Sequence, residues 1–128
     1  MPKQPIHTSR APRAVGPYSQ AVATGNVVYC SGQIALDPAT NELNTGSFEQ
    51  QVRQIFANLG AVAKAAGGSL DDAVKITAFL TDLSCFAEFN ELMEEFFSPP
   101  FPARAAVGVT ALPLGVDVEV DAILALDP

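Results

Sequence analysis

Residues 47–68 of this 128-residue chain read SFEQQVRQIFANLGAVAKAAGG and carry its clearest structural signal. Ser47 and Gln50 form a capping box, in which the Ser47 hydroxyl accepts a hydrogen bond from an otherwise unpaired backbone amide. Apolar residues then recur at steps of three and four, at Phe48, Val52, Ile55, Phe56, Leu59, Val62, Ala63 and Ala66. Gly67 and Gly68 supply the left-handed residue that ends such a helix. The stretch predicts an amphipathic helix.

Segments with an alternating pattern lie on both sides of this helix. Strands are predicted at residues 19–23, 27–36, 73–81, 103–109 and 116–124, and the Gly25-Asn26 step joins the first two as a hairpin. Ser84 is expected to cap a second helix, which ends at Pro99-Pro100 and carries the apolar stripe Phe86, Phe89, Met93, Phe96 and Phe97. This order predicts a single α+β domain over residues 1–128, with one sheet and both helices on one face.

The composition suits a globular protein and argues against several classes of partner. Hydrophobic residues make up 48% of the chain and charged residues 16%, which provides a core and excludes a disordered chain. The formal net charge is −7. Because binding to nucleic acid and to anionic membranes depends on Lys and Arg, we expect neither partner. No segment resembles a signal peptide or a membrane span, so a cytoplasmic protein is expected.

Residues that commonly bind metals or perform covalent catalysis are few. His7 is the only histidine, and Cys30 and Cys85 are far apart in the sequence. We therefore expect no metal site and no Ser-His-acid triad. Cys30 lies in an apolar run and is interpreted as a core residue rather than a reactive thiol. Cys85 stands at a predicted helix start, with no partner base nearby.

The sheet face away from the helices is expected to mix small and charged side chains. The period of two assigns to this face Tyr29, Ser31, Lys75, Thr77, Arg104, Ala106, Gly108, Glu119 and Asp121. Such a face lies against water or closes against another copy of the chain. Small residues beside an arginine favour the second arrangement, because they leave room for a pocket.

Arg104 and Glu119 are the candidate site residues, and each has a structural alternative. A guanidinium on an otherwise small, apolar strand can bind a carboxylate through two parallel hydrogen bonds. It can equally form a structural salt bridge with Glu119 or Asp121. Glu119 is either a carboxylate that handles water or part of a solvated acidic stripe. Asn90 lies along the apolar stripe of the second helix, either buried with hydrogen-bond partners or at a wet edge.

Several short motifs together resemble the RidA/YjgF family of reactive-intermediate deaminases. They are residues 16–22 (GPYSQAV), 31–34 (SGQI), 101–107 (FPARAAV), and 112–113 (LP) followed by 118–123 (VEVDAI). The motifs occur in the family's order and span about residues 12–125. Each motif alone is modest support, whereas the set is specific.

The resemblance implies a fold similar to that of the trimeric chorismate mutases, a mixed sheet with two helices on one face. In that fold the last strand is inserted into the middle of the sheet, whereas residues 112–115 read locally as a simple hairpin loop. The resemblance also implies a homotrimer with three sites in the clefts between subunits.

The implied activity is the hydrolysis of 2-imino and enamine acids, such as 2-iminobutanoate and 2-iminopropanoate, to 2-keto acids and ammonia. Arg104 matches the family's carboxylate-binding arginine, and Glu119 matches the acid that positions water. The further pocket positions are matched by Tyr18, Ser31, Gly32 and Asn90. No cofactor is implied.

One position departs from many bacterial members, which have Ser-Cys after the motif arginine where this chain has Ala105-Ala106. The alanine pair resembles that of animal members. It excludes a thiol at position 106, where Ala106 is expected to contribute backbone groups to the pocket. Two other functions remain open at this point: a non-catalytic trimer that binds keto acids as a regulator, and a translation-inhibiting ribonuclease.

Overall fold

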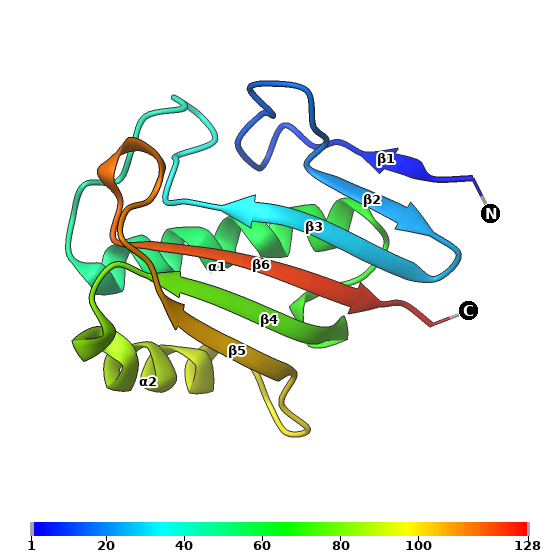
Figure 1. Cartoon of the computed structure of the whole chain (residues 1–128). Helices are drawn as coiled ribbons and strands as arrows, with labels where there is room; N and C mark the ends of the chain where they lie inside the picture. Colours follow the sequence, from blue (N-terminus) through cyan, green and yellow to red (C-terminus); the bar gives the residue numbers. More distant parts are fainter. Residues whose placement is uncertain (1, 128) are drawn as a thin grey trace.

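Six strands form one mixed sheet in the structure, a computed structural model that describes residues 2–127. The sheet order is β1-β2-β3-β6-β4-β5, with β6 in the middle (Figure 1). The strands are β1 (Gln4–Ile6), β2 (Ala21–Thr24), β3 (Val27–Gln33), β4 (Ala73–Leu80), β5 (Ala103–Gly108) and β6 (Val118–Ala125). No helix within residues 2–127 has the length and apolar character needed to cross a bilayer.

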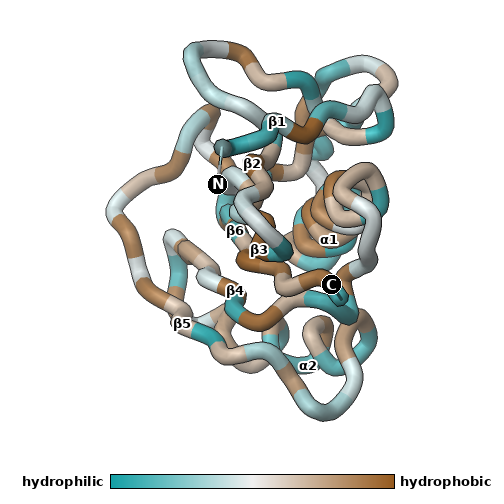
Figure 2. Tube along the Cα trace, turned by 90° about the vertical axis from the view of Figure 1, so that its right-hand side faces the viewer, coloured by the Kyte–Doolittle hydropathy of each residue, from teal (hydrophilic) through white to brown (hydrophobic). Residues whose placement is uncertain are grey.

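The helices α1 (Phe48–Ala65) and α2 (Phe86–Phe96) cover one face of this sheet (Figure 2). The predicted capping box of α1 is present, because Ser47 accepts from the Gln50 amide and Gln50 accepts from the Ser47 amide. Gly67 follows the helix with a φ of 98°, which an L side chain rarely adopts. The central prediction of two helices on one face of a sheet is confirmed.

The start of α2 differs from the prediction. Ser84 does not cap the helix; it lies within a short 3-10 turn, Leu83–Cys85. The Asp82 carboxylate accepts from the Ser84 amide at 2.9 Å and caps that turn, while Cys85 precedes α2 without a side-chain cap. Asp and Ser are both good capping residues, and Asp82 comes first in the chain.

The connection from β5 to β6 is not a hairpin. Within residues 2–127, β5 pairs only with β4, in parallel, while β6 pairs antiparallel with both β3 and β4. A short 3-10 turn at Pro113–Gly115 lies in the crossing, which carries the chain over β4. The inserted last strand implied by the family resemblance is therefore confirmed, and the local interpretation of residues 112–115 is wrong.

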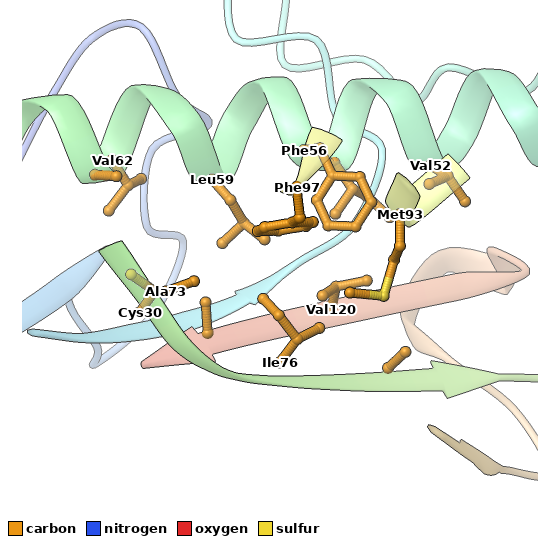
Figure 3. Packing of buried hydrophobic residues seen from close by; sticks show 14 of the residues in the cluster. Cys30, Val52, Phe56, Leu59, Val62, Ala73, Ile76, Met93, Phe97 and Val120 are labelled. Atoms are coloured by element: carbon orange, nitrogen blue, oxygen red, sulfur yellow. The ribbon is translucent and has the colours of Figure 1, made fainter. Parts of the chain in front are cut away.

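The core lies between the sheet and α1. Figure 3 shows Val52, Phe56, Leu59 and Val62 of α1 pointing toward the sheet, above Ile76 and Val120. The Phe56 ring also contacts Phe89, Phe96 and Phe97, with ring centroids 5.0–6.0 Å apart, and so joins α1 to α2. Cys30 belongs to this core, as predicted.

The predicted face of β5 is wrong. Arg104 is paired with Ile76, which is fully buried beneath the helices, and Ala106 is paired with Ala78, which is buried there too. Residues paired in a ladder share a face, so Arg104 and Ala106 point to the helix side of the sheet. Glu119 is paired with Phe79 and points to the opposite, open side. Alanines at both parities of this strand leave its orientation undetermined by pattern.

Candidate functional site

Arg104 projects from the edge strand β5 against α2. Its guanidinium donates to the Asn90 side-chain oxygen, lies 3.6 Å from the Met93 sulfur, and sits 4.9 Å from the centroid of the Phe86 ring. These three side chains repeat at helical spacing along one face of α2. Asn90 is half-buried and lies at the wet edge of the stripe rather than in the core, where its side chain orients the arginine.

The charge of Arg104 is not neutralised within the described chain. Among residues 2–127 the ion pairs join Arg53 to Glu49 and Glu95. The alternative of a structural salt bridge from Arg104 to Glu119 or Asp121 is therefore wrong. An amide, a sulfur and an aromatic ring orient the guanidinium without cancelling its charge, which leaves it suited to bind an anion.

A cavity of about 390 Å³ opens beside Arg104. Its lining combines Arg104 with Asn90, Met93 and Glu94 of α2, and with Phe101 and Pro102 from the loop before β5. Among the described residues, Glu94 forms no ion pair with Arg104. We call it the arginine cavity. It has room for a small organic acid, whose carboxylate would meet the guanidinium.

A second cavity of about 400 Å³ contains Glu119. We call it the glutamate cavity. It is lined by parts of the loop at 12–18, by the end of β3 and the residues after it, and by the turn before β6. Tyr18 and Gly32 line it, as does Arg13. The Tyr18 hydroxyl accepts from the Val15 amide at 3.2 Å, which fixes the ring across the loop.

Gly32 allows the Glu119 carboxylate to approach the backbone of β3. A Cβ atom at position 32 would lie 2.5 Å from Glu119 Oε2 and 3.0 Å from its carboxyl carbon. Any side chain at this position would displace the carboxylate. The pairing of a glycine in motif 31–34 with a glutamate in motif 118–123 thus has a steric reason.

The environment of Glu119 favours its protonated form. Burial raises the pKa of Glu119, and the nearby charge of Asp121 raises it further. Burial also raises the pKa of Asp121, against the opposing effects of a hydrogen bond with Thr77 and the charge of Lys75. A carboxylate with a raised pKa in a cavity is a better proton acceptor than a solvated one.

Replacing Glu119 with glutamine should stabilise the fold at neutral pH. Because the folded-state pKa is raised, the folded chain holds this proton at pH values where the unfolded chain has lost it. The ionised Glu119 carboxylate therefore destabilises the folded chain. This destabilisation is absent below the ordinary glutamate pKa, grows as pH rises from there through the folded-state pKa of Glu119, and is complete above that pKa. Thermal melts of Glu119→Gln and wild type should therefore coincide at acid pH and separate at neutral pH. A variant less stable than wild type at neutral pH would contradict this.

One chain does not bring all the expected site residues together. Arg104 and Asn90 line the arginine cavity, while Tyr18, Gly32 and Glu119 line the glutamate cavity. The two groups lie on opposite faces of the sheet. A small molecule cannot contact Arg104 and Glu119 of the same chain at once.

Two expected pocket residues line neither cavity. The Ser31 hydroxyl donates to the Ser19 carbonyl at 2.6 Å, and the Ser31 amide donates to the Gln20 carbonyl at 3.0 Å. Ser31 thus ties the residues next to Tyr18 to β3. Ala106 packs against the core. A backbone role for Ala106 stays a prediction.

Several residues of the two cavities are not predicted from the sequence as site residues. The apolar stripe of the second helix predicts Phe86 and Met93 only as core. Their spacing from Asn90 places all three on one side of α2, where Met93 lines the arginine cavity and the Phe86 ring lies against the Arg104 guanidinium. Arg13 and Leu114 line the glutamate cavity without any pattern in the sequence that marks them.

Comparison with known proteins identifies the family. A family model described as "Endoribonuclease L-PSP" matches residues 8–126. The chain belongs to the RidA/YjgF family. A 2-iminobutanoate/2-iminopropanoate deaminase of Dermatophagoides farinae is 44% identical over 126 residues, covering 98% of each chain.

Solved structures of RidA/YjgF proteins share the fold. The crystal structure of RidA from the Antarctic bacterium Psychrobacter sp. PAMC 21119 is 54% identical, with a TM-score of 0.93 over 96% of this chain and 99% of that one. The crystal structure of E. coli TdcF with bound serine is 39% identical, with a TM-score of 0.90 over 97% and 99% of the two chains.

Proposed function

We propose that this chain is a subunit of a hydrolytic deaminase that converts 2-imino acids such as 2-iminobutanoate and 2-iminopropanoate to 2-keto acids and ammonia. The proposal rests on one observation: the arginine cavity and the glutamate cavity are complementary, and we call each a half-site. One cavity presents a guanidinium without a carboxylate partner, and the other presents a carboxylate with a raised pKa. A relative named for this activity and a relative with bound serine both support a small amino-acid-like substrate.

The half-sites meet when copies of the chain assemble, and we propose a homotrimer. The open sheet face exposes apolar side chains, with Tyr29 exposed by 52% and Val107 by 40%. Phe101, beside the arginine cavity, is 51% exposed. Apolar side chains gathered on one sheet face are typical of a protein interface. A ring of three copies places the arginine cavity of each subunit against the glutamate cavity of the next.

In the proposed mechanism the substrate carboxylate binds Arg104 through two parallel hydrogen bonds, and the Gly32 amide donates to it. A water molecule held beside Glu119 attacks the carbon of the protonated imine, and the C=N π electrons move to nitrogen. Glu119 takes a proton from this water, which gives a carbinolamine. Glu119 then returns the proton to nitrogen, the C–N bond breaks as the carbonyl forms, and ammonia leaves with the hydroxyl proton. Holding water and imine in register lowers the entropic barrier.

The positions of the other site residues fit this mechanism. Asn90 and Met93 hold the guanidinium so that its planar edge meets the substrate. Tyr18 closes one side of the glutamate cavity, and Ser31 fixes the backbone beside Tyr18. Ala106 brings no thiol, so the nucleophile is water rather than cysteine. Burial raises the pKa of Cys30 to about 11, which keeps that thiol protonated and unreactive.

The environment of Glu119 also favours an enzyme over a non-catalytic protein that senses keto acids. A protein that only binds carboxylates gains nothing from a half-buried glutamate in the ligand cavity, whereas hydrolysis needs a base there. Ribonuclease activity, to which the family model's description refers, fits the charge poorly, because a net charge of −7 repels a phosphate backbone.

A coupled assay tests the proposed reaction. A pyridoxal-phosphate threonine dehydratase releases 2-aminocrotonate, which becomes 2-iminobutanoate and hydrolyses spontaneously. Adding the chain should make 2-ketobutanoate appear faster, with a rate that rises with the chain's concentration and no change in threonine consumption. Equal rates with and without the chain would contradict the proposed function.

A further inference from the structure

The buried polar side chains of the described residues are all carboxamides, and they gather around one site. Among residues 2–127 they are Gln20, Gln33, Gln51 and Asn58, each no more than 6% exposed. Gln33 and Gln20 line the glutamate cavity. Gln20, Gln51 and Asn58 make hydrogen bonds to the three segments of chain that form the walls of this cavity.

Gln20 fixes the loop that carries Tyr18. Its side-chain oxygen accepts from the Thr8 amide at 2.7 Å, and its nitrogen donates to the carbonyls of Thr8, Ala11 and Pro12 at 2.7–3.2 Å. One 3%-exposed side chain thus pairs four backbone groups. These bonds hold the segment that leads into residues 12–18, a wall of the glutamate cavity.

Gln51 and Asn58, both on α1, fix the other two walls. The Gln51 nitrogen donates to an Asp117 carboxylate oxygen at 2.9 Å, and its oxygen accepts from the Asp117 amide at 3.1 Å. This anchors the turn that contains Leu114. Asn58 donates to the Leu36 carbonyl at 2.9 Å and so holds the residues after β3. The segments anchored by α1 lie at the same end of the sheet (Figure 1).

We propose that Gln20, Gln51 and Asn58 form a carboxamide frame that positions the walls of the glutamate cavity and limits the access of water to Glu119. They are positioning residues: Gln51 and Asn58 act on Glu119 through the loops they hold, and Gln20 holds a loop and also lines the cavity itself. Carboxamides suit this role because each one both donates and accepts, so it pairs several loop backbone groups without adding charge near the carboxylate. Buried unpaired backbone groups would otherwise loosen these loops.

The test replaces each frame residue with an uncharged side chain of similar size, as Gln20→Met, Gln51→Met and Asn58→Leu. The measurement is a carbon NMR titration of the Glu119 carboxyl group, whose resonance is assigned from its absence in Glu119→Gln. Charged or titratable groups near Glu119 are Asp121 on the open sheet face, and Arg13 and Tyr18 on the cavity wall; Lys75 lies near Asp121. The substitutions leave these groups in place. Gln51 and Asn58 do not line the cavity, so a change of the titration in Gln51→Met or Asn58→Leu reports water access, whereas Gln20→Met also makes the lining less polar.

We expect the pKa of Glu119 to fall toward its ordinary glutamate value in each frame variant, because a loosened wall admits water. We also expect kcat for imine hydrolysis to fall by roughly 10- to 100-fold, since small misplacements of reacting groups are costly. Val62→Ala is the matched control: it truncates a buried residue near the other end of α1 and lowers the melting temperature. It should move neither the pKa of Glu119 nor kcat.

Two results would overturn the frame. One is an unchanged pKa of Glu119 in folded Gln20→Met and Gln51→Met. The other is a pKa shift of Glu119 in Val62→Ala as large as the shift in the frame variants, which would indicate a general loss of stability. If Gln20→Met does not fold, Gln51→Met decides alone, because it releases only the turn at Asp117 and the bond to the Gly46 carbonyl. The kinetic part rests on the proposed function, whereas the titration does not. A wild type without deaminase activity but with shifted pKa values in the variants would refute the enzyme and support the frame.

Discussion

A mixture of Arg104→Ala and Glu119→Gln subunits should recover about a quarter of the wild-type activity, although each variant alone is inactive. If each site takes Arg104 from one subunit and Glu119 from its neighbour, a mixed trimer contains intact sites. A site is intact when a Glu119→Gln subunit supplies the arginine and an Arg104→Ala subunit supplies the glutamate. Each condition holds about half the time in a random equimolar assembly. The measurement is the coupled assay after joint refolding from denaturant.

The control for this experiment uses two variants in the same cavity. Gly32→Ala displaces the Glu119 carboxylate, so Gly32→Ala and Glu119→Gln both damage the glutamate cavity. Mixing these two should restore nothing, because no subunit then offers an intact glutamate cavity. An inactive mixture of Arg104→Ala and Glu119→Gln, with native mass spectrometry that shows mixed trimers, would exclude the shared site.

Much of the fold can be predicted where structure depends on neighbouring residues. The capping box at Ser47, the stripe along α1 and the hairpin at Gly25-Asn26 are local signals, and all three are confirmed. The strand β1 is not predicted, because three residues that include Pro5 carry no alternating pattern. The second predicted strand also extends too far, since β3 ends at Gln33 and not at residue 36.

Long-range features need more than local pattern. Nothing in residues 112–115 shows that the chain crosses β4 to place β6 beside β3; the family resemblance supplies that. The predicted orientation of β5 is wrong for a physical reason: Ala103, Ala105 and Ala106 suit either face, so only the packing of Arg104 against α2 settles it. Because the orientation of β5 is wrong in the prediction, the prediction also places Arg104 and Glu119 on the same face.

In the candidate site, too, the sequence predicts the residues but not their arrangement in space. The motifs identify Arg104, Glu119, Tyr18 and Gly32 by type, yet they do not reveal that these residues occupy two separate cavities. The separation arises from the strand register, which turns Arg104 toward α2 and Glu119 toward the open face, and which sequence spacing does not encode. It also changes the chemical interpretation, because an arginine and a glutamate on one face would neutralise each other, whereas in separate cavities both remain available.

Arg104→Lys and Glu119→Gln should fail in different ways, and this difference decides between enzyme and sensor. Lysine keeps the charge at position 104 but loses the planar edge that matches a carboxylate, and it cannot reproduce the contact with Asn90 in the same geometry. We expect a loss of roughly 2–4 kcal/mol in transition-state binding, or about 30- to 1000-fold in kcat/KM. Calorimetry with 2-ketobutanoate should show weakened binding to this variant.

Glu119→Gln keeps the shape of the side chain and removes the base, so kcat should fall by roughly 100-fold or more. Its binding of 2-ketobutanoate should persist and tighten, because a negative charge near the ligand carboxylate is gone. Calorimetry and the coupled assay on the same preparations compare the two variants directly. Imine hydrolysis by Glu119→Gln at the wild-type rate would show that Glu119 is not the base. Binding of keto acids by a wild type that never accelerates imine hydrolysis would establish a sensor, since the arginine half of the site would then work without the glutamate half.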